Sequence, residues 1–335
     1  MTGKRALAVV VAIALIVGAI FLRRQLDDPS VADPGTPGGS DSGRTAICTP
    51  EVAAACQTMG LASVTVELPG VTAARLARSG GTLGADLWVA PSFWSAMVTE
   101  LARQTGNDSP VALTMSPTLA RSGLAFVTRS DRARALAAAC ASPADWACIT
   151  SRAGDSWSSL GGSATWGSFT VGIDDITTTA GLMSVAAATV AHFGRSALAT
   201  NDFDDDDTFG PALNKLGSAA PTSTAGGTTP LERYLRIPAT ASSVTEINAV
   251  AEPAVAASRD APSIERTIPN VAVVADLVIA GNADFINSLD RPRWTAALKA
   301  AGWSLPEATD LPAEGGLPSA GVLVALTARW KQIAQ

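Results

Sequence analysis

Four cysteines are the residues of this chain with the clearest chemical spacing. Cys48 lies eight positions before Cys56, and Cys140 lies eight positions before Cys148. Four cysteines allow three pairings, of which two local loops of equal size are the simplest. Because disulfides persist in oxidising compartments, this pairing predicts an exported domain. Four buried free thiols are the alternative, whereas a zinc site would need shorter spacing within each pair.

Any histidine chemistry would depend on His192, the one histidine in the sequence. It lies late in an expected helix, where the helix dipole stabilises a charged imidazole, so we expect a structural role. A serine hydrolase would need a Gly-x-Ser-x-Gly turn, which the serine–glycine cluster at 161–163 does not form. The glycines at 80–84 stand between a helix and a strand, the wrong order for a dinucleotide-binding loop. The sequence therefore predicts no enzyme and no cofactor.

Acidic side chains outnumber basic ones in this chain. Residues 201–207 form its one acidic run, but the run lacks the spacing and the glycine turn of a calcium-binding loop. We expect a solvated acidic loop there and no metal site. The net charge of −6 argues against a nucleic-acid partner, because a nucleic-acid-binding domain would be basic. With 47% hydrophobic residues among 335, disorder along the whole chain is excluded.

A hydrophobic segment near the N-terminus predicts a membrane anchor. Residues 6–22 carry no charge and have two basic residues on each side. As a helix the segment would be about 25 Å long, at the short end of a membrane span. A cleaved signal peptide would end in a small-residue cleavage site, and none follows this segment. We therefore expect an uncleaved signal anchor over 1–24, with a cleaved peptide or a buried helix as the alternatives.

The residues after this anchor predict a tether. Proline, glycine, serine and aspartate dominate 25–44, and no apolar period is present, which is typical of a flexible linker. The folded domain is expected over 45–335. The charges that flank the anchor are nearly balanced, so its orientation is inferred from the cysteines. We expect a single-pass plasma-membrane protein whose C-terminal domain is extracellular.

Short β-rich runs alternate with alanine-rich helical runs from Thr45 onward. The expected strands are 63–68, 85–90, 124–128, 169–173 and 271–279. The expected helices are 50–59, 72–78, 92–101, 131–141, 180–193 and 283–301. Such alternation predicts an α/β fold with a mostly parallel sheet. A domain of this length accommodates two lobes.

Two segments have a characteristic order of residue types. Residues 85–94 place an aspartate before an apolar strand that ends in Pro-Ser. Residues 166–182 lead from a strand through two aspartates to three threonines and Gly-Leu. Both orders resemble type 2 periplasmic, or extracellular, solute-binding proteins. The family commonly has Asp-Pro in the second segment, and this chain has Ile176 in place of the proline.

The resemblance extends over about residues 45–305. Residues 123–128 are similar to the strand that enters the second lobe in this family, and 285–303 are similar to a late helix. More narrowly, the chain resembles membrane-anchored actinobacterial substrate-binding domains, without the von Willebrand A domain that some carry. The resemblance implies a two-lobed α/β fold, here preceded by one N-terminal transmembrane helix.

The family binds a solute in a cleft between its lobes, often through hydroxyls and backbone N–H groups at helix N-termini. Such N-termini have free donors and a positive dipole end, which suits anions and carboxylates. The resemblance implies ligand contacts from Thr49, Ser92, Phe93, Trp94, Trp166, Asp175, Thr177, Thr178 and Thr179. Ordinary helix capping by the hydroxyl residues and core packing of the tryptophans are the alternatives.

The expected function is capture of a small polar or anionic solute by a membrane-tethered extracellular protein, for delivery to a membrane transporter or sensor. The alternative is a cell-envelope interaction module that keeps the fold and binds a protein partner. These two functions differ in whether the site residues converge on an open pocket.

Overall fold

The computed structural model describes residues 41, 43–140, 145–220, 228–237, 241–269, 273–308, 311 and 316–333. They belong to a compact unit over 39–335. The expected signal anchor and nearly all of the expected linker lie outside the described residues. Among the helices that the structure describes, none combines the length and the apolar character needed to cross a membrane.

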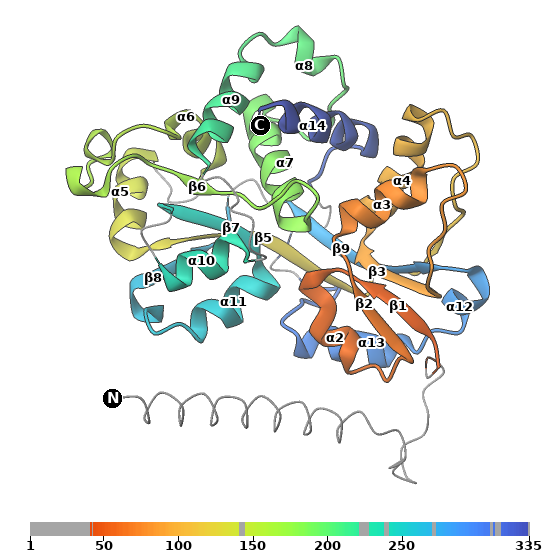
Figure 1. Ribbon diagram of the computed structural model, residues 1–335. Helices are drawn as coiled ribbons and strands as arrows, with labels where there is room; N and C mark the ends of the chain where they lie inside the picture. Colours follow the sequence, from red (N-terminus) through yellow and green to blue (C-terminus); the bar gives the residue numbers. More distant parts are fainter. Residues whose placement is uncertain are drawn as a thin grey trace, which may run out of the picture. The chain divides into compact units, whose positions relative to one another are not determined.

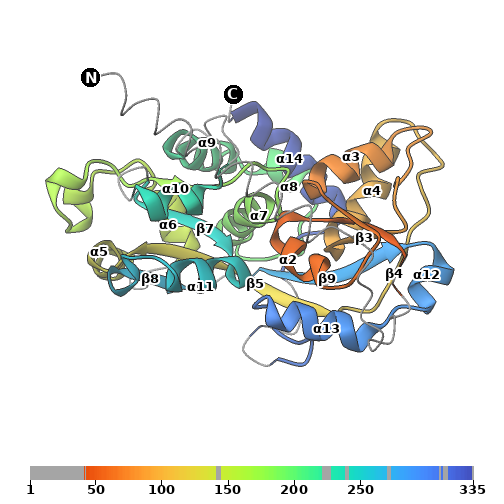
Figure 2. The same ribbon diagram turned by 60° about the horizontal axis from the view of Figure 1, so that its bottom comes forward.

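The first lobe contains a sheet in the order β2-β1-β3-β9, to which the short strand β4 is added beside β9. Its strands are β1 (Thr45–Cys48), β2 (Ser63–Val66), β3 (Leu87–Pro91), β4 (Thr114–Met115) and β9 (Val274–Gly281). Its helices are η1 (Pro50–Val52), α2 (Ala53–Gln57), α3 (Pro69–Ala77), α4 (Ser92–Gln104), α12 (Ala283–Asn287) and α13 (Arg291–Ala300). Figure 2 shows α3 and α4 on one side of this sheet and α13 on the other.

The second lobe contains the strand order β5-β7-β6, with β8 also paired to β5. Its strands are β5 (Ala120–Arg129), β6 (Val171–Gly172), β7 (Ser243–Ile247) and β8 (Ile264–Thr267). Its longer helices are α5 (Ser130–Cys140), α6 (Trp146–Arg152), α7 (Thr179–Phe193), α9 (Phe209–Ala219), α10 (Pro230–Arg236) and α11 (Asn248–Ala256). The short ones are η2 (Trp157–Leu160), η3 (Ala164–Trp166), α8 (Asp202–Asp205) and η4 (Ala261–Ser263).

Two strands connect the lobes. The first residues of β5 pair with β9, and its later residues pair with β7 and β8 (Figure 1). All of these pairings are antiparallel, as is that of β3 with β9, whereas β1 with β2, β1 with β3, and β6 with β7 are parallel. The α/β class is therefore confirmed, but the expected mostly parallel sheet is wrong. β5 runs from the first lobe into the second and β9 runs back, so these two neighbouring strands have opposite directions.

Helix α7 lies at the centre of the packing. All of its residues from Thr179 to Val190 are buried, which fits a helix that is apolar on every side. One hydrophobic cluster continues through both lobes and includes residues of α4 and α7. The C-terminal helix α14 (Ala320–Ile333) packs against α4 of the first lobe and against α7 and α9 of the second. The lobes are thus packed together by helices as well as joined by strands.

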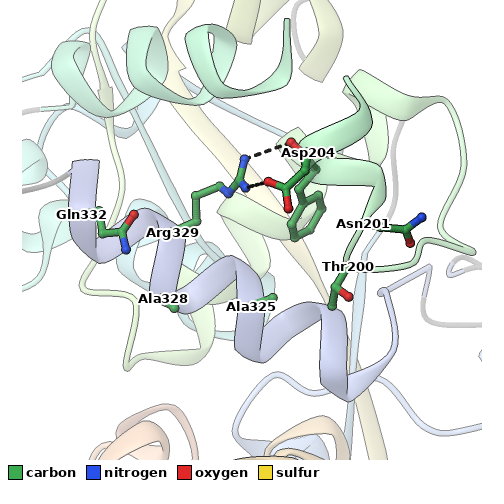
Figure 3. A pocket seen from close by; sticks show the side chains of 8 residues that line it. Thr200, Asn201, Asp204, Ala325, Ala328, Arg329 and Gln332 are labelled. Carbon is green, nitrogen blue, oxygen red and sulfur yellow. Dashed lines mark hydrogen bonds and ion pairs between the residues drawn. The ribbon is translucent and has the colours of Figure 1, made fainter. Parts of the chain in front are cut away.

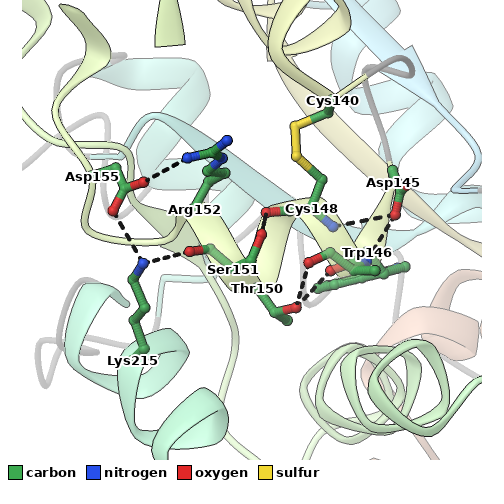
Figure 4. The surroundings of a disulfide bond; sticks show 10 residues. Cys140, Asp145, Trp146, Cys148, Thr150, Ser151, Arg152, Asp155 and Lys215 are labelled. Atoms are coloured by element: carbon green, nitrogen blue, oxygen red, sulfur yellow. Dashed lines mark hydrogen bonds and ion pairs between the residues drawn. A yellow bond between two sulfur atoms is a disulfide. The ribbon is translucent and has the colours of Figure 1, made fainter. Parts of the chain in front are cut away.

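Both expected disulfides are present. Cys48 bonds to Cys56 and joins the end of β1 to α2, and both residues are fully buried. Cys140 bonds to Cys148 and joins the end of α5 to α6, where Asp145 caps the helix by accepting from the backbone of Cys148 (Figure 4). The described cysteines include no free thiol.

Two differences between the structure and the sequence-based elements concern how the domain is delimited and packed. The expected helix over 283–301 is two helices, α12 and α13, because Asp290 caps a new helix at the backbone N–H of Arg293. The folded unit also begins before Thr45. Asp41 is almost fully buried and accepts a hydrogen bond from Trp294 Nε1 at 3.0 Å. The end of the expected linker therefore belongs to the domain.

Candidate functional site

The carboxyl ends of four strands meet where the two lobes face each other. β1 is followed by Thr49 and Glu51, and β3 is followed by the first turn of α4. β6 leads through Asp174 to α7, and β7 carries Glu246 as its next-to-last residue. Because ligands in α/β proteins bind outside the carboxyl ends of strands, this junction is the candidate site.

Thr179, the first residue of α7, connects the lobes. Its hydroxyl donates to Glu51 Oε1 at 2.5 Å and accepts from Trp94 Nε1 at 3.3 Å. Thr179 and Trp94 are both buried. The junction between the lobes is thus a polar contact made by side chains of η1, α4 and α7.

A second contact joins the lobes at the loop before α7. The backbone N–H of Gly70, in the first turn of α3, donates to the carbonyl of Thr177 at 2.9 Å. Thr178 caps α7, because its hydroxyl accepts from the N–H of Gly181 at 3.0 Å and donates to the carbonyl of Asp175. The Asp175 carboxylate accepts from the backbone N–H and the hydroxyl of Thr177. Three of the expected ligand residues therefore order the start of α7.

Carboxyl groups give the junction its electrostatic character. Burial raises the pKa of Glu51, an effect that its hydrogen bond to Thr179 partly offsets. Burial also raises the pKa of Glu246 to about 8, and the nearby charges of Asp174 and Glu51 reinforce this shift. The pKa of Asp174 is raised by burial as well, against a smaller opposite effect of Arg233. Glu246 is buried, whereas Glu51 and Asp174 are half-buried, so burial disfavours the charged form most strongly at Glu246.

The sequence interpretation did not select Glu51, Asp174 or Glu246. Each lies at or just beyond the end of a strand, which was the available signal. Their proximity depends on contacts between segments far apart in the chain, such as that of Glu51 with Thr179.

Thr49 is the most enclosed of the expected ligand residues. It is fully buried, and its hydroxyl forms no hydrogen bond of regular geometry within the described part of the chain. The hydroxyl lies near enough to the Glu51 carboxylate to lower its pKa. Thr49 therefore lies beside Glu51 at the same junction.

Ser92 and Phe93 line a cavity beside the junction. The cavity measures about 370 Å³ and also includes Ser196 of the second lobe and Asp276 of β9. Asp276 forms an ion pair with the buried Arg121 at 2.7 Å, between the two strands that connect the lobes. The volume lies within the usual range of small-molecule sites, roughly 300–1,000 Å³. Ser92 thus faces this cavity, whereas Trp94 of the same helical turn is buried against Thr179.

No family model and no curated protein matches the sequence. Solved structures do match. A periplasmic thiamin-binding protein superposes with a TM-score of 0.54 and 14% identity, over 90% of this chain and 99% of that one. The fold is that of a periplasmic binding protein. AfuA from Actinobacillus pleuropneumoniae, with fructose-6-phosphate bound, has a TM-score of 0.52 and 13% identity, over 88% and 96%. The periplasmic binding protein P5PA has a TM-score of 0.51 and 11% identity, over 88% and 100%.

Within this periplasmic-binding-protein fold, Trp166 packs against another tryptophan and an arginine. It belongs to η3, where its ring packs edge-on against Trp157 with 5.5 Å between centroids. The guanidinium of Arg132 lies 5.9 Å from the same ring. Neither of these contacts of Trp166 is with another expected ligand residue.

His192 has structural contacts. Its Nε2 lies 2.9 Å from Asp206 Oδ2, and the ring packs against Phe193 and Phe209. The pKa of Asp206 is lowered to about 2, first by its hydrogen bond from the Thr208 hydroxyl and then by that to His192. His192 therefore links the end of α7 to the turn that begins α9.

The sequence predicted a solvated acidic loop at 201–207, and most of these side chains are indeed exposed, but part of the run is helical. Asp202–Asp205 form the short helix α8, and Arg329 of α14 bonds to Asp204 and to the carbonyl of Phe203 (Figure 3). Asp202 pairs with Arg195 at 2.9 Å. A cavity of about 420 Å³ lies between α8 and α14. The ion pairs of Asp202 with Arg195 and of Asp204 with Arg329 connect α8 to the neighbouring segments.

Proposed function

We propose that this protein captures a small polar solute between its two lobes. It acts outside the cell, is tethered to the plasma membrane by its N-terminal segment, and passes the solute to a transporter or sensor in that membrane. The observation that carries the proposal is the contact of Thr179 with Glu51 and Trp94 across the lobes. Opening or closing of the lobes about β5 and β9 would break or remake this contact.

The fold and the polar junction support this function in different ways. The periplasmic-binding-protein fold places strand ends of both lobes at one junction, where ligands of α/β proteins bind. The residues at that junction are hydroxyls, carboxyls and an indole, which are groups that recognise polar solutes.

The anionic solute expected from the sequence fits this junction poorly. The start of α7 is already capped by Thr178, so its N–H groups are not all free for an anion. The carboxyl groups of Glu51, Asp174 and Glu246 bring no positive charge to an anion, and they repel one when they are ionised. Of the two solute classes expected from the sequence, we therefore propose a polar solute and not an anionic one.

A second candidate function is an interaction module of the cell envelope. It is favoured by one observation: Thr179 is buried against the other lobe, and its hydroxyl is bonded to groups of this chain. If these contacts keep the junction closed to solutes, a protein partner would bind to the outer surface of the domain instead.

Thermal unfolding of the full chain in detergent tests both functions. The probes are amino acids, amines, sugars and oxyanions, and a ligand at 100 times its Kd should add about 2.7 kcal/mol to the free energy of unfolding. Thr179→Val should abolish the shift, whereas Thr189→Val, also buried on α7 but bonded within its own helix, should retain it. Equal shifts in both variants would move the site elsewhere, and no shift with any probe would favour the interaction module.

The tether has its own test. If the C-terminal domain is extracellular, protease added to intact cells should digest it. If the domain is inside the cell, digestion should require lysis of the cells first. Release of the intact domain into the medium would instead indicate a cleaved signal peptide.

A further inference from the structure

We propose that the solute of this protein is an uncharged compound with several hydroxyl groups, a sugar or polyol, and that it binds in the cavity lined by Ser92, Ser196 and Asp276, the α4 cavity. The inference rests on the proposed function, because it names the chemical class of the solute and the space that holds it.

The walls of the α4 cavity come from both lobes and from a strand that connects them. Ser92 and Ala96 lie on α4 of the first lobe, Ser196 follows α7 of the second, and Asp276 lies on β9. The segment that leads into α14 lines another side. A solute in this cavity contacts both lobes at once, so its binding favours the arrangement of the lobes that forms these walls.

The hydroxyls of the cavity are free, whereas that of the junction is occupied. Thr179 already bonds to Glu51 and Trp94 through its hydroxyl. In contrast, the hydroxyls of Ser92 and Ser196 form no hydrogen bond within the described part of the chain, and both side chains are half-buried. A serine hydroxyl both donates and accepts, which suits the hydroxyl groups of a solute.

Asp276 adds an acceptor to the cavity. Its Oδ1 lies 2.7 Å from Nε of Arg121, whose side chain is 6% exposed, whereas the Asp276 side chain is 31% exposed. Its other oxygen, Oδ2, accepts no hydrogen bond from the residues that the structure describes. A carboxylate has about four acceptor sites, so Asp276 can accept from solute hydroxyls while it stays paired with Arg121.

The balance of charge favours an uncharged solute. Arg121 compensates the charge of Asp276, and the described residues that line the cavity include no other ionisable side chain. An anion would meet a carboxylate and no lining cation, and a cation would meet a carboxylate that is already paired. Because a charge taken out of water needs its own counter-charge, either ion is costly here, and a hydroxyl compound is not.

The rest of the lining suits the carbon skeleton of such a compound. Apart from one glycine, its side chains are apolar, namely those of Phe93, Ala96, Val274, Leu317, Pro318 and Ala320. The volume of about 370 Å³ lies near the lower end of the range for small-molecule sites, roughly 300–1,000 Å³. A single sugar ring or a short polyol, with hydroxyls on one side and C–H groups on the other, fits this combination.

Isothermal titration calorimetry of the full chain, in a detergent without a sugar headgroup, tests the inference. The uncharged probes are glucose, sorbitol and myo-inositol, and the charged ones are choline chloride and sodium sulfate. We expect at least one uncharged probe to bind. Its affinity should change less than twofold between about 0.01 M and 1 M salt, because salt screens only charges.

Two variants test the place of binding. Ala96→Leu adds bulk to the cavity from the exposed side of α4 and should weaken binding at least tenfold. Thr99→Leu is the matched control, because it is exposed on the same helix and does not line the cavity. Ser196→Ala removes a hydroxyl without adding bulk and should weaken binding at least threefold. Thermal unfolding of each variant shows that it is folded.

The outcomes separate the inference from the function on which it rests. Binding of an uncharged probe that is lost in Thr179→Val but unchanged in Ala96→Leu and Ser196→Ala overturns the cavity and leaves solute capture standing. Binding of choline or sulfate in place of the uncharged probes, or an affinity that falls steeply with salt, overturns the solute class. Absence of binding by every probe overturns both the inference and the proposed function.

Discussion

The backbone N–H of Gly70 donates to the carbonyl of Thr177 and joins the first turn of α3 to the loop that precedes α7. A Cβ atom at Gly70 would lie 2.8 Å from the Cα of Thr177, closer than real Cβ contacts. The absence of a side chain at Gly70 therefore sets how closely the lobes approach here.

Gly70→Ala should force these two segments apart. We expect a loss of about 1–3 kcal/mol in the free energy of unfolding, the usual effect of overpacking, and weaker binding of any solute held between the lobes. Chemical denaturation and calorimetry measure the two effects. Gly210→Ala is the matched control, because a Cβ there would meet no atom within 4 Å. Wild-type stability in Gly70→Ala would show that this contact does not limit the approach of the lobes.

The two hydroxyl residues at helix starts should differ in their effect on stability. Thr178 caps α7 through the N–H of Gly181, so Thr178→Ala should cost about 1 kcal/mol. Ser92 is the first residue of α4, whose cap position, Pro91, makes no side-chain hydrogen bond. Ser92→Ala should therefore cost less than about 0.5 kcal/mol, as surface substitutions do. Urea denaturation of both variants checks this order, and equal losses would contradict it.

Glu246 predicts a dependence of stability on pH. Its pKa is about 8 in the folded protein against an ordinary value of 4.5. Between these pH values the folded state holds a proton that the unfolded state has lost. The free energy of unfolding therefore falls as the pH rises through this window, by at most about 1.4 kcal/mol per pH unit.

Glu246→Gln removes this dependence, because the amide has no proton to lose. The variant should match the wild-type protein near pH 4 and exceed it in stability at pH 8, as measured by denaturation at a series of pH values. Glu252→Gln serves as the control, since that carboxylate is exposed and paired with Arg266. A slope in Glu246→Gln as steep as that of the wild-type protein would place the titrating group elsewhere.

The buried contacts of Asp41 predict where a stable fragment of the domain must begin. Its carboxylate accepts from Trp294 Nε1 and pairs with Arg44 at 2.8 Å. A fragment that begins at Thr45 leaves the buried indole N–H without this partner and should be about 1–3 kcal/mol less stable than one that begins at Gly39. A fragment from Gly43, which keeps Arg44, should resemble the shorter one. Identical urea midpoints for all three would show that Asp41 contributes nothing.

Local chemistry accounts for what the sequence predicted well. Capping depends on residues three or four positions apart, so Thr178 could be placed at the start of α7, and the disulfides connect neighbours in the chain. The break at Asp290 was missed, although it too is local, because the apolar period continues across it.

The site was harder to predict because its residues meet through the fold. Glu51 and Thr179 are 128 positions apart, and the carboxyl character of the junction appears only when β1, β6 and β7 are brought together. Trp166 illustrates the opposite case. Its position beside a family-like motif favoured a ligand contact, whereas its ring packs with Trp157 and Arg132.

The spacing of the disulfides has a consequence for how the chain matures. Each native bond closes a loop between cysteines eight positions apart, whereas either mispaired arrangement would have to close loops about ten times longer. Chain entropy alone then disfavours a long loop by about 2 kcal/mol relative to a short one. Correct oxidation can therefore precede folding, and the two bonds can form in either order. Such a protein should need an oxidant but little help from a disulfide isomerase.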